Sequence, residues 1–442
     1  MKRGHAKKIA ILGFGREGRS TLKFLKRAPE FRGAELWILD KNADTKIPRG
    51  LRARLGKNYL ADLHDFDLVF RAPGIPYTLP PLIRARRRGV RFTSLMELFF
   101  THCPAKIIGV TGTKGKGTTA TLLCKILKAA GRDAYFAGNV GTPALEIIQK
   151  LKKGSLVVLE LSSFQLQGTK TSPPVALVLD VFPDHQDAHK NLKEYYEAKA
   201  NIARFQKPHD AVFFFKNSRM SEWVARHGRG KKIAVDERAF GHFGPENLKM
   251  PGFHNFRNAI MAATVARALG VPDRIIVKTI KAFSGNKHRL EFVRKIGNVF
   301  FYNDSASTNP QTSAAAAKAF PGNPKVLIAG GKDKKLDYAP LAKALRESRI
   351  TRIILLGENK KKIERTLRPA LKNSVSRAPI QLVSNLQAAV RAAYRAARSV
   401  RRAVKPPVVL FSPGAASFDQ FENYADRGEQ FKRLVRKLKE KN

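Results

Sequence analysis

The sequence predicts an α/β protein of three domains, each built on a largely parallel sheet covered by helices. Short runs of β-branched and aliphatic residues alternate with longer amphipathic stretches along most of the chain. The length of 442 residues corresponds to about three domains at roughly 150 residues each. Because 43% of the residues are hydrophobic and 27% are charged, the composition supports sizeable cores and excludes a wholly disordered or fibrous chain.

The apolar runs fall into three blocks, which predict domains of residues 1–103, 104–286 and 287–442. Strands are expected at Lys8–Leu12, Glu35–Leu39, Asp67–Phe70, Lys106–Thr111, Leu156–Leu159, Val175–Leu179, Ala211–Phe215, Val299–Tyr302, Val326–Ala329, Ile353–Leu356 and Val408–Phe411. Helices are expected from about Ser20, from near Gly117, over Asn255–Leu269 and from about Gly428 to Leu438. The basic segment Gln387–Val404 predicts an amphipathic helix whose apolar side faces a sheet rather than a membrane or a nucleic acid.

The net charge is unusually positive, with 83 lysines and arginines against 35 aspartates and glutamates, a formal charge of +48. Such a field attracts polyanions of any kind, including nucleic acid, anionic membranes and phosphorylated small molecules. The basic residues are spread along the whole chain, without a basic tail or an arginine-glycine repeat. This distribution favours a general property of the surface over a specific nucleic-acid site.

Cysteine content and hydropathy bear on the compartment. Two cysteines, Cys103 and Cys124, exclude a disulfide framework and a four-thiolate metal site, and they suit a reducing compartment. Arg16 and Glu17 interrupt the first apolar stretch and no small-residue cleavage site follows, so this stretch predicts a strand rather than a signal peptide. No apolar run approaches the roughly 18–20 residues needed to span a bilayer. We therefore expect a cytoplasmic protein without membrane insertion.

The strongest functional signal is the glycine-rich segment Gly112-Thr-Lys-Gly-Lys-Gly-Thr-Thr119, which follows a predicted strand and opens a predicted helix. Backbone N–H groups and the positive end of a helix dipole hold phosphate at such a position, and Lys116 can reach the outer phosphates of a nucleotide. Since Gly117 directly follows this lysine, a hydroxyl ligand for Mg²⁺ has to come from Thr118 or Thr119. The alternative is a tight glycine turn without a ligand.

A second glycine turn, Gly13-Phe-Gly-Arg-Glu-Gly18, follows the first predicted strand, and Asp40 ends the next one. This pattern is typical of Rossmann-type nucleotide binding, in which the acidic residue meets a ribose. The pattern does not distinguish a nicotinamide ribose from another nucleoside. A turn needed only for packing the helix on the strand is the structural alternative.

Polar side chains follow two further strands of the middle block. Glu160 comes directly after Leu156–Leu159, and Asp184, His185 and Asp187 follow the next predicted strand. Parallel strands end at one edge of their sheet, where open α/β proteins place ligands. Mg²⁺ prefers oxygen ligands and keeps several waters, so one carboxylate and one hydroxyl beside nucleotide phosphates would suffice, with His185 as an additional ligand.

The third block has three polar or glycine-rich loops after predicted strands, at residues 303–309, 330–334 and 412–417. Loops at neighbouring strand ends form the rim of a pocket. Each of them alone is equally explained as a helix cap or a turn, and their spacing does not fix their roles.

The order of the motifs resembles the Mur ligase family over nearly the whole chain. The resemblance rests on Val110-Thr-Gly-Thr-Lys-Gly-Lys116, Glu160-Leu-Ser-Ser-Phe-Gln-Leu166, Asp184-His185, Gly252-Phe-His-Asn-Phe-Arg-Asn258, His288-Arg289, Asn303-Asp-Ser305 and Ser412-Pro-Gly-Ala-Ala-Ser-Phe-Asp-Gln-Phe421. It implies a Rossmann-like N-terminal domain for the UDP end of a substrate, a central P-loop ATPase domain with a parallel sheet, and a C-terminal Rossmann-like domain for an amino acid.

The resemblance also implies a reaction. The γ-phosphate of ATP passes to a substrate carboxylate, and the amino group of an amino acid attacks the acyl phosphate to give an amide. The ending Phe418-Asp-Gln-Phe-Glu-Asn-Tyr424 is similar to the branch that adds D-glutamate to UDP-N-acetylmuramoyl-L-alanine in cytoplasmic peptidoglycan precursor synthesis. That branch implies ATP, two Mg²⁺ ions and a monomer.

The resemblance assigns roles residue by residue. ATP is expected at Gly112, Thr113, Lys114, Gly115, Lys116, Gly117, Thr118, Asn258, Arg289 and Asp304. The metal ligands are expected to be Thr118, Glu160 and His185, and the catalytic residues Lys116, His185 and Lys199, of which Lys199 would be carbamylated. The UDP substrate is expected at Gly15, Arg16, Gly18, Asp40, Gly74, Asn139, Ser163 and Gln165, and D-glutamate at Thr308, Lys334, Ser417, Phe418 and Tyr424.

Two residues depart from the pattern of that branch. Gly117 stands where a serine or threonine usually follows the lysine, and Lys-Gly-Ser is typical of the related folylpolyglutamate synthetases. Ala306 stands where Asn-Asp-Ser is usually followed by a lysine, which removes a cation on the side of the amino acid. A folate-type ligase therefore remains an alternative, and the net charge leaves a basic, nucleotide-regulated nucleic-acid-binding protein as another.

Overall fold

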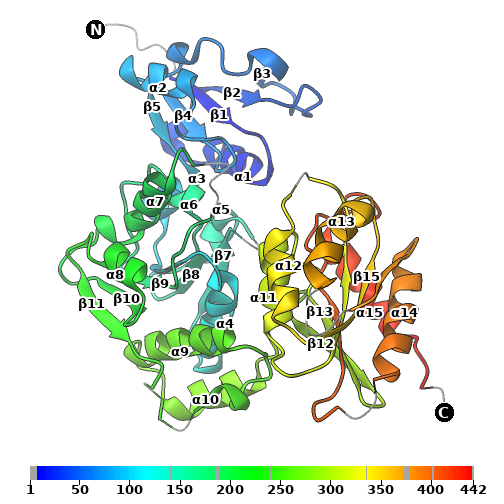
Figure 1. The fold of residues 1–442 in the computed structure, drawn as a ribbon. Coiled ribbons are helices and arrows are strands. Elements are labelled where there is room, and N and C mark those ends of the chain that lie inside the picture. Colours follow the sequence, from blue (N-terminus) through cyan, green and yellow to red (C-terminus); the bar gives the residue numbers. More distant parts are fainter. Residues whose placement is uncertain are drawn as a thin grey trace, which may run out of the picture. The chain divides into compact units, whose positions relative to one another are not determined.

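The computed structural model describes residues 7–139, 142–184, 189–238, 240–241, 243–334, 336–372, 378–400 and 403–440. Within these residues the chain forms three sheets with helices on their faces (Figure 1), which confirms the predicted α/β class. The chain divides into two compact units. The first comprises Met1–His242 and Arg257–Ile280, and the second comprises Phe243–Phe256 and Lys281–Asn442.

The first sheet has the order β3-β2-β1-β4-β5 with parallel pairing throughout. Its strands are β1 (Lys8–Leu12), β2 (Glu35–Asp40), β3 (Arg52–Leu55), β4 (Leu68–Arg71) and β5 (Arg91–Thr93), and its helices are α1 (Arg16–Leu25), α2 (Pro80–Arg87) and α3 (Leu95–His102). The strand order reverses between β1 and β4, so the loops after these two strands border the crevice where open sheets bind ligands.

The first helix begins four residues earlier than predicted, at Arg16 instead of Ser20. Gly15 is its N-cap, Glu17 lies in its first turn near the positive end of the dipole, and Gly18 is therefore a helical residue. A Cβ at Gly18 would lie 2.2 Å from the carbonyl oxygen of Gly13, so the helix passes too close to the turn after β1 for any side chain. The glycine that indicated a turn is there for this close approach.

The second sheet has the order β11-β10-β9-β6-β8-β7 and is also parallel. Its strands are β6 (Lys106–Thr111), β7 (Ala134–Gly138), β8 (Leu156–Glu160), β9 (Val175–Val178), β10 (Ala211–Phe215) and β11 (Lys231–Val235). The helices that follow along the chain are α4 (Lys116–Ala129), α5 (Ala144–Ile147), α6 (Ser163–Leu166), α7 (Leu192–Arg204), α8 (Arg219–Ala225), α9 (Phe253–Ala268) and α10 (Asp273–Ala282).

One continuous apolar core joins the first two sheets. It includes Ile9 of β1, Phe99 of α3, Leu145 of α5, Leu159 of β8 and Ile202 of α7, all buried. Because α1 and α3 pack against α5, the first two predicted blocks share one core and form a single unit.

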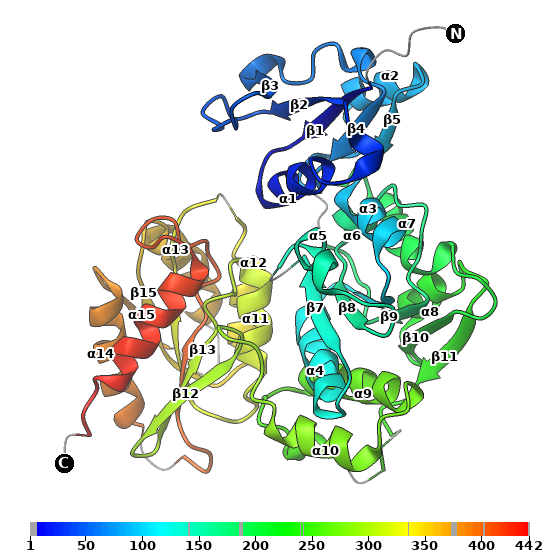
Figure 2. The same ribbon diagram turned by 180° about the vertical axis from the view of Figure 1, so that it is seen from behind.

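The third sheet has the order β12-β13-β17-β14-β15-β16, with β12 antiparallel to β13 and the remaining pairs parallel. Its strands are β12 (Glu291–Ile296), β13 (Val299–Asn303), β14 (Lys325–Ala329), β15 (Ile350–Leu355), β16 (Ile380–Leu382) and β17 (Val408–Phe411). Helices α11 (Pro310–Lys318), α12 (Ala339–Arg346) and α13 (Lys360–Lys372) cover one face, and α14 (Leu386–Arg398) and α15 (Tyr424–Arg436) cover the other (Figures 1 and 2).

Helix α14 buries Leu386, Ala389, Val390 and Ala393 against the sheet, which confirms the expectation for the basic segment from Gln387. Its apolar side is therefore occupied within the protein. The last helix begins at Tyr424, four residues before the predicted start at Gly428. The side chain of Asn423 caps it by accepting from the N–H groups of Ala425 and Asp426.

Candidate active site

The phosphate loop lies at the carboxyl end of β6, in the interior of the second sheet. Gly112 and Gly115 have φ angles of 151° and 86°, which favour glycine, and Gly115 is the N-cap of α4. A Cβ at Gly115 would lie 2.2 Å from Oδ1 of Asn258, so α9 brings this predicted ATP residue against the loop. The start of α4 at Lys116 leaves the first backbone N–H groups of the helix available to an anion.

Two lysines converge on one backbone carbonyl of this loop. Nζ of Lys116 donates to the oxygen of Gly112 at 3.1 Å, and Nζ of Lys199 donates to the same oxygen at 2.8 Å. Lys199 lies on α7, is 2% exposed, and has its ammonium 4.8 Å from the ring centroid of Tyr195. Burial, followed by the charge of Lys116, holds the pKa of Lys199 well below its usual value. The site has an excess of positive potential that a bound anion would neutralise.

The rest of the loop is tied to the segment after β9. The backbone N–H of Thr113 donates to the carbonyl of Asp180, and the Thr113 hydroxyl lies 2.8 Å from that of Tyr195. Lys114 and Asp184 form an ion pair at 2.9 Å. Burial raises the pKa of Tyr195 above its ordinary value, so the phenol stays protonated. Asp184 therefore lies at the predicted edge of the sheet, next to the loop.

Glu160 is the last residue of β8, one position inside the strand that was expected to end before it. Its carboxylate is 3% exposed, and Oε1 accepts from Nδ2 of Asn139 at 3.3 Å. The other oxygen, Oε2, is buried and has no hydrogen-bond partner among the described residues. A buried carboxylate oxygen without a donor fits a cation ligand.

The other predicted metal ligand on this side, His185, lies outside the described residues. Within the part of the chain that the structure describes, no group of three or more His, Cys, Asp or Glu side chains is arranged to hold a metal ion. Thr118, the predicted hydroxyl ligand, is 9% exposed in the first turn of α4. Glu160 and Thr118 thus lie at the ends of neighbouring elements around the loop.

In the first sheet, Asp40 organises the glycine turn. Its Oδ2 accepts from the N–H of Phe14 at 2.6 Å and its Oδ1 from the N–H of Asn42 at 2.9 Å. The space around Gly15 and Gly74 is open, since a Cβ at either would have no neighbour within 4 Å. These residues follow β1 and β4, the two strands that flank the crevice.

The predicted substrate residues of the second sheet contact the first sheet. Nε2 of Gln165 donates to Glu17 at 2.7 Å, and Arg16 donates to the backbone oxygen of Asn139 at 3.2 Å. Gln165 also forms a capping box with Ser162 at the start of α6, which fixes its side chain. Residues of the glycine turn therefore contact residues that follow β7 and β8 within the first unit.

Three further residues of this region were missed by sequence reasoning. Arg71 is 3% exposed and donates to the carbonyl oxygens of Ile75, Phe164 and Gln167, which link the two sheets. His189 is 4% exposed and its Nε2 lies 3.0 Å from Oγ of Ser163. Tyr195 is the third. Tyr195 and Lys199 lie four residues apart on α7, and this spacing was the only signal that could have indicated the pair.

The second unit brings the three predicted loops of the third block to one sheet edge. They follow β13, β14 and β17, and because β17 pairs in parallel with both β13 and β14, the three loops lie at the same edge of the sheet. Lys332 pairs with Ala416 across two of the loops, and the N–H of Gly414 donates to the oxygen of Ser307 across another two.

Side chains predicted to bind D-glutamate lie along this rim. Nζ of Lys334 lies 5.5 Å from the ring centroid of Phe418, which is 64% exposed. Tyr424 is 40% exposed at the start of α15, Ser417 is buried, and Thr308 is partly exposed. A cation therefore lies beside an accessible ring at this edge of the sheet, which suits a small anionic molecule.

Asp304 and Arg289 also belong to the second unit, whereas Asn258 belongs to the first. Asp304 is 5% exposed and its carboxylate accepts from the N–H of Leu290 and from the hydroxyls of Ser307 and Ser412. Burial raises its pKa to about 6. The structure thus gives this predicted nucleotide residue three protein partners.

Known proteins resemble the chain over almost all of its length. Residues 110–266 match the family model described as Mur ligase middle domain, and residues 288–412 match the one described as Mur ligase, glutamate ligase domain. A UDP-N-acetylmuramoylalanine–D-glutamate ligase from Acetivibrio thermocellus is 37% identical over 463 aligned positions, covering 98% of this chain and 97% of the relative. The chain belongs to the Mur ligase family.

Solved structures agree with a Mur ligase fold. The UDP-N-acetylmuramate–alanine ligase MurC from Thermotoga maritima has a TM-score of 0.57 at 17% identity. The match covers 98% of this chain and 99% of the MurC chain. A folylpolyglutamate synthase from Mycobacterium tuberculosis, complexed with ADP, has a TM-score of 0.58 at 14% identity over 78% of this chain and 94% of its own. Among the described residues, the helices are all too short or too polar to cross a bilayer.

Proposed function

We propose that this Mur ligase joins D-glutamate to UDP-N-acetylmuramoyl-L-alanine at the expense of ATP. The observation that carries the proposal is identity to relatives named for this reaction, 37% and 35% over 98% of the chain, together with a phosphate loop flanked by two lysines. The reaction belongs to peptidoglycan precursor synthesis, and we place it in the cytoplasm, carried out by a monomer. Its domains are residues 1–103 for the UDP substrate, 104–286 for ATP and 287–442 for the amino acid.

The phosphate loop supplies positioning and charge. Residues Gly112, Thr113, Lys114, Gly115, Lys116, Gly117 and Thr118 hold the ATP phosphates. In this role Lys116 moves from its carbonyl partners to the γ-phosphate, where it neutralises charge as the phosphoryl group passes to the substrate carboxylate. The carboxylate oxygen attacks phosphorus, the bond to the β-phosphate oxygen breaks, and ADP leaves. The amine of D-glutamate then attacks the acyl carbon and releases phosphate.

The metal would be held by Glu160, Thr118 and His185. When bound, Mg²⁺ neutralises phosphate charge during the transfer. The buried, partnerless Oε2 of Glu160 supports this assignment, because such an oxygen is costly unless a cation or a donor meets it. One hydroxyl and one carboxylate are a sufficient protein contribution to a Mg²⁺ that retains waters and phosphate ligands.

Lys199 is assigned as the site of a carbamate. Its lowered pKa increases the neutral fraction of the amine, and a neutral amine can attack carbon dioxide, lose a proton and become an anionic carbamate. The modification replaces a cation that crowds Lys116 by an anion that supports the metal. The carbamate N–H can still donate to the oxygen of Gly112, which Lys199 contacts now.

The two substrates occupy the remaining predicted residues. The UDP end lies at Gly15, Arg16, Gly18, Asp40 and Gly74, and the muramoyl-alanine end lies at Asn139, Ser163 and Gln165. D-Glutamate lies at Thr308, Lys334, Ser417, Phe418 and Tyr424. Lys334 pairs with one of its carboxylates.

The test is phosphate release by the purified protein with ATP, Mg²⁺ and UDP-N-acetylmuramoyl-L-alanine, adding D-glutamate, L-lysine, meso-diaminopimelate or L-glutamate one at a time. Release with D-glutamate alone supports the proposal, and release with another amino acid or with none refutes it. Gly117 favours a second candidate, a folate ligase, and turnover of folates with L-glutamate would support that candidate instead. The same assay applied to Lys116→Met tests the phosphate-loop lysine. Lys128→Met, at the far end of α4, is its matched control.

A further inference from the structure

The segment that enters the third sheet has an unusual backbone. His288 has a φ of 63° and Leu290 has a φ of 44°, a left-handed conformation that residues other than glycine rarely adopt. Both side chains are buried, at 5% and 8% exposure, while Arg289 between them is exposed. Two strained residues on either side of an exposed arginine present that arginine in a defined direction.

Three tertiary hydrogen bonds hold the strained backbone. The N–H of His288 donates to Oε2 of Glu291 at 2.9 Å, and the N–H of Leu290 donates to Oδ1 of Asp304 at 3.1 Å. The carbonyl of His288 accepts from the N–H of Ala306 at 2.9 Å. Two of the three partners are side chains, and Glu291 is the one for which no role has been assigned.

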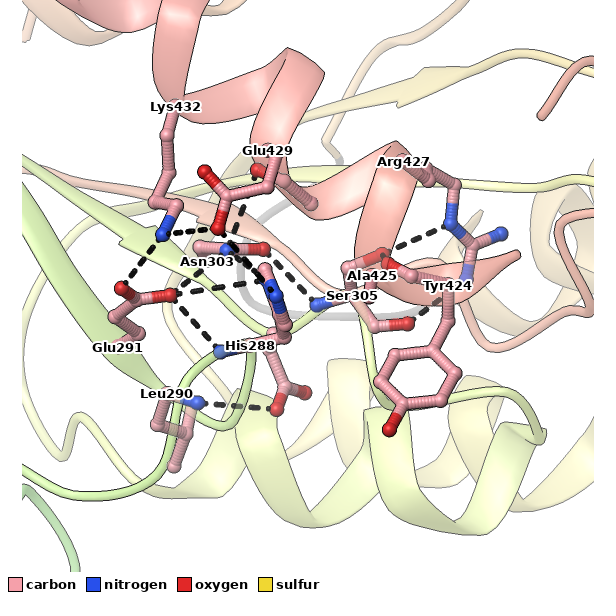
Figure 3. A network of polar contacts seen from close by, with 12 residues as sticks. His288, Leu290, Glu291, Asn303, Ser305, Tyr424, Ala425, Arg427, Glu429 and Lys432 are labelled. Carbon is pink, nitrogen blue, oxygen red and sulfur yellow. Dashed lines mark hydrogen bonds and ion pairs between the residues drawn. The ribbon is translucent and has the colours of Figure 1, made fainter. Parts of the chain in front are cut away.

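Glu291 is itself fixed from two sides (Figure 3). Its Oε1 accepts from Nζ of Lys432 at 3.0 Å, and its Oε2 accepts from Nδ2 of Asn303 at 3.0 Å. The Lys432 side chain is 6% exposed and also pairs with Glu429 at 2.8 Å. The Asn303 amide has a definite orientation, because its Oδ1 accepts from the N–H of Ser305.

The imidazole of His288 closes the same cluster. Its Nδ1 accepts from Nδ2 of Asn303 at 2.9 Å, since that amide nitrogen is a donor. A Cβ at Gly428 would lie 2.2 Å from the same ring nitrogen, so α15 packs its glycine directly on the ring. Residues of β12, β13 and α15 therefore all restrict the backbone that carries Arg289.

We propose that Glu291 is a positioning residue for Arg289: its carboxylate fixes the strained turn and thereby the backbone that carries this predicted ATP-binding guanidinium. This inference rests on the proposed function and on the assignment of Arg289 to ATP. Without the carboxylate, the N–H of His288 loses its partner, and the backbone at residues 288–290 relaxes toward ordinary φ values. Arg289 then keeps its charge, but its guanidinium is no longer held in one orientation.

The test is a double-mutant cycle with Arg289→Ala and Glu291→Ala, read as kcat/KM for ATP, because glutamine would keep an oxygen that can accept from the N–H of His288. Arg289→Ala is expected to lower kcat/KM by about 10- to 100-fold, the loss of hydrogen bonds to a charged group. Glu291→Ala is expected to lower it about tenfold, and the double variant is expected to match Arg289→Ala within about twofold. The KM for UDP-N-acetylmuramoyl-L-alanine should stay unchanged in all three.

Glu347→Ala, which removes an exposed carboxylate paired with Lys318 in the same unit, is the matched control and should leave kcat/KM unchanged. The inference is overturned if the fold losses in kcat/KM of the two single variants multiply in the double variant, because Glu291 then acts independently of Arg289. If Glu291→Ala does not fold, Lys432→Gln is taken through the same cycle, and multiplied losses there overturn the inference equally. Absence of turnover by the unmodified protein refutes the proposed function, whereas turnover with multiplied losses refutes this inference alone.

Discussion

Replacing Asp304 by asparagine should change how the stability of the protein depends on pH. The carboxyl is 5% exposed and burial raises its pKa from 3.8 to about 6. Because the pKa in the folded state is raised, the folded protein binds the proton more tightly than the unfolded chain. The contribution of this proton to stability is complete below pH 3.8 and is lost as the pH rises through about 6.

The size of the effect follows from the shift. A rise from 3.8 to about 6 corresponds to about 3 kcal/mol over the full range. Between pH 5 and pH 7.5 the remaining part is about 1.4 kcal/mol, since the proton is mostly bound at pH 5 and mostly released at pH 7.5. Asparagine keeps the three contacts: its oxygen accepts from the N–H of Leu290, and its amide donates to the hydroxyls of Ser307 and Ser412.

The assay is urea unfolding of the natural protein and of Asp304→Asn at pH 5 and at pH 7.5. The free energy of unfolding of the variant, relative to the natural protein, should be about 1.4 kcal/mol higher at pH 7.5 than at pH 5. Asp337→Asn, which removes an exposed carboxylate of the same unit, is the control and should show no such difference. A difference for Asp304→Asn that is constant within about 0.3 kcal/mol would mean that Asp304 is ionised throughout this range, and the reasoning would be wrong.

Three further substitutions test the first unit. Lys116→Met should lower kcat by at least about 100-fold in the phosphate-release assay without lowering the melting temperature, because it removes the charge that meets the transferred phosphate; retained activity would contradict this. Gly115→Ala should raise the KM for ATP about tenfold or more, since φ is 86° and the new Cβ would lie 2.2 Å from Asn258; an unchanged KM would show that the loop adapts. Arg71→Met should lower the free energy of unfolding by about 3 kcal/mol, because it leaves buried carbonyls without donors. Urea unfolding measures this change, with Arg19→Met as the control.

The strands that the sequence predicted and those it missed differ in position. Every predicted strand lies in the interior of its sheet, and among the described residues the missed strands are the two edge strands of each sheet. A central parallel strand such as β9, Val-Ala-Leu-Val, is covered on both faces and is therefore entirely apolar. An edge strand such as β3, Arg-Ala-Arg-Leu, is partly exposed and carries the charges that protect an open edge. Periodicity finds the first kind because burial dictates its composition, and it cannot find the second.

The same division holds for the candidate site. Local spacing located the phosphate loop and Glu160, because a glycine turn or a carboxylate at a strand end is a short-range pattern. Arg71, His189 and Glu291 depend on partners far away in the sequence: Arg71 meets Phe164 and Gln167, and Glu291 meets Lys432. Such residues have no local pattern, because each is selected by the backbone groups that folding brings beside it.

The first unit leaves electrostatic deficits of opposite sign around one loop. The side-chain nitrogens of Lys116 and Lys199 share the carbonyl of Gly112, while Oε2 of Glu160 is buried without a donor among the described residues. Lys199 and Glu160 are 2% and 3% exposed, so bulk solvent does not reach either of them. A bare anion would satisfy only the lysines, and a bare cation only the glutamate. A metal–nucleotide complex carries both charges at once, so it should stabilise this unit against heat more than the sum of the nucleotide alone and the metal alone.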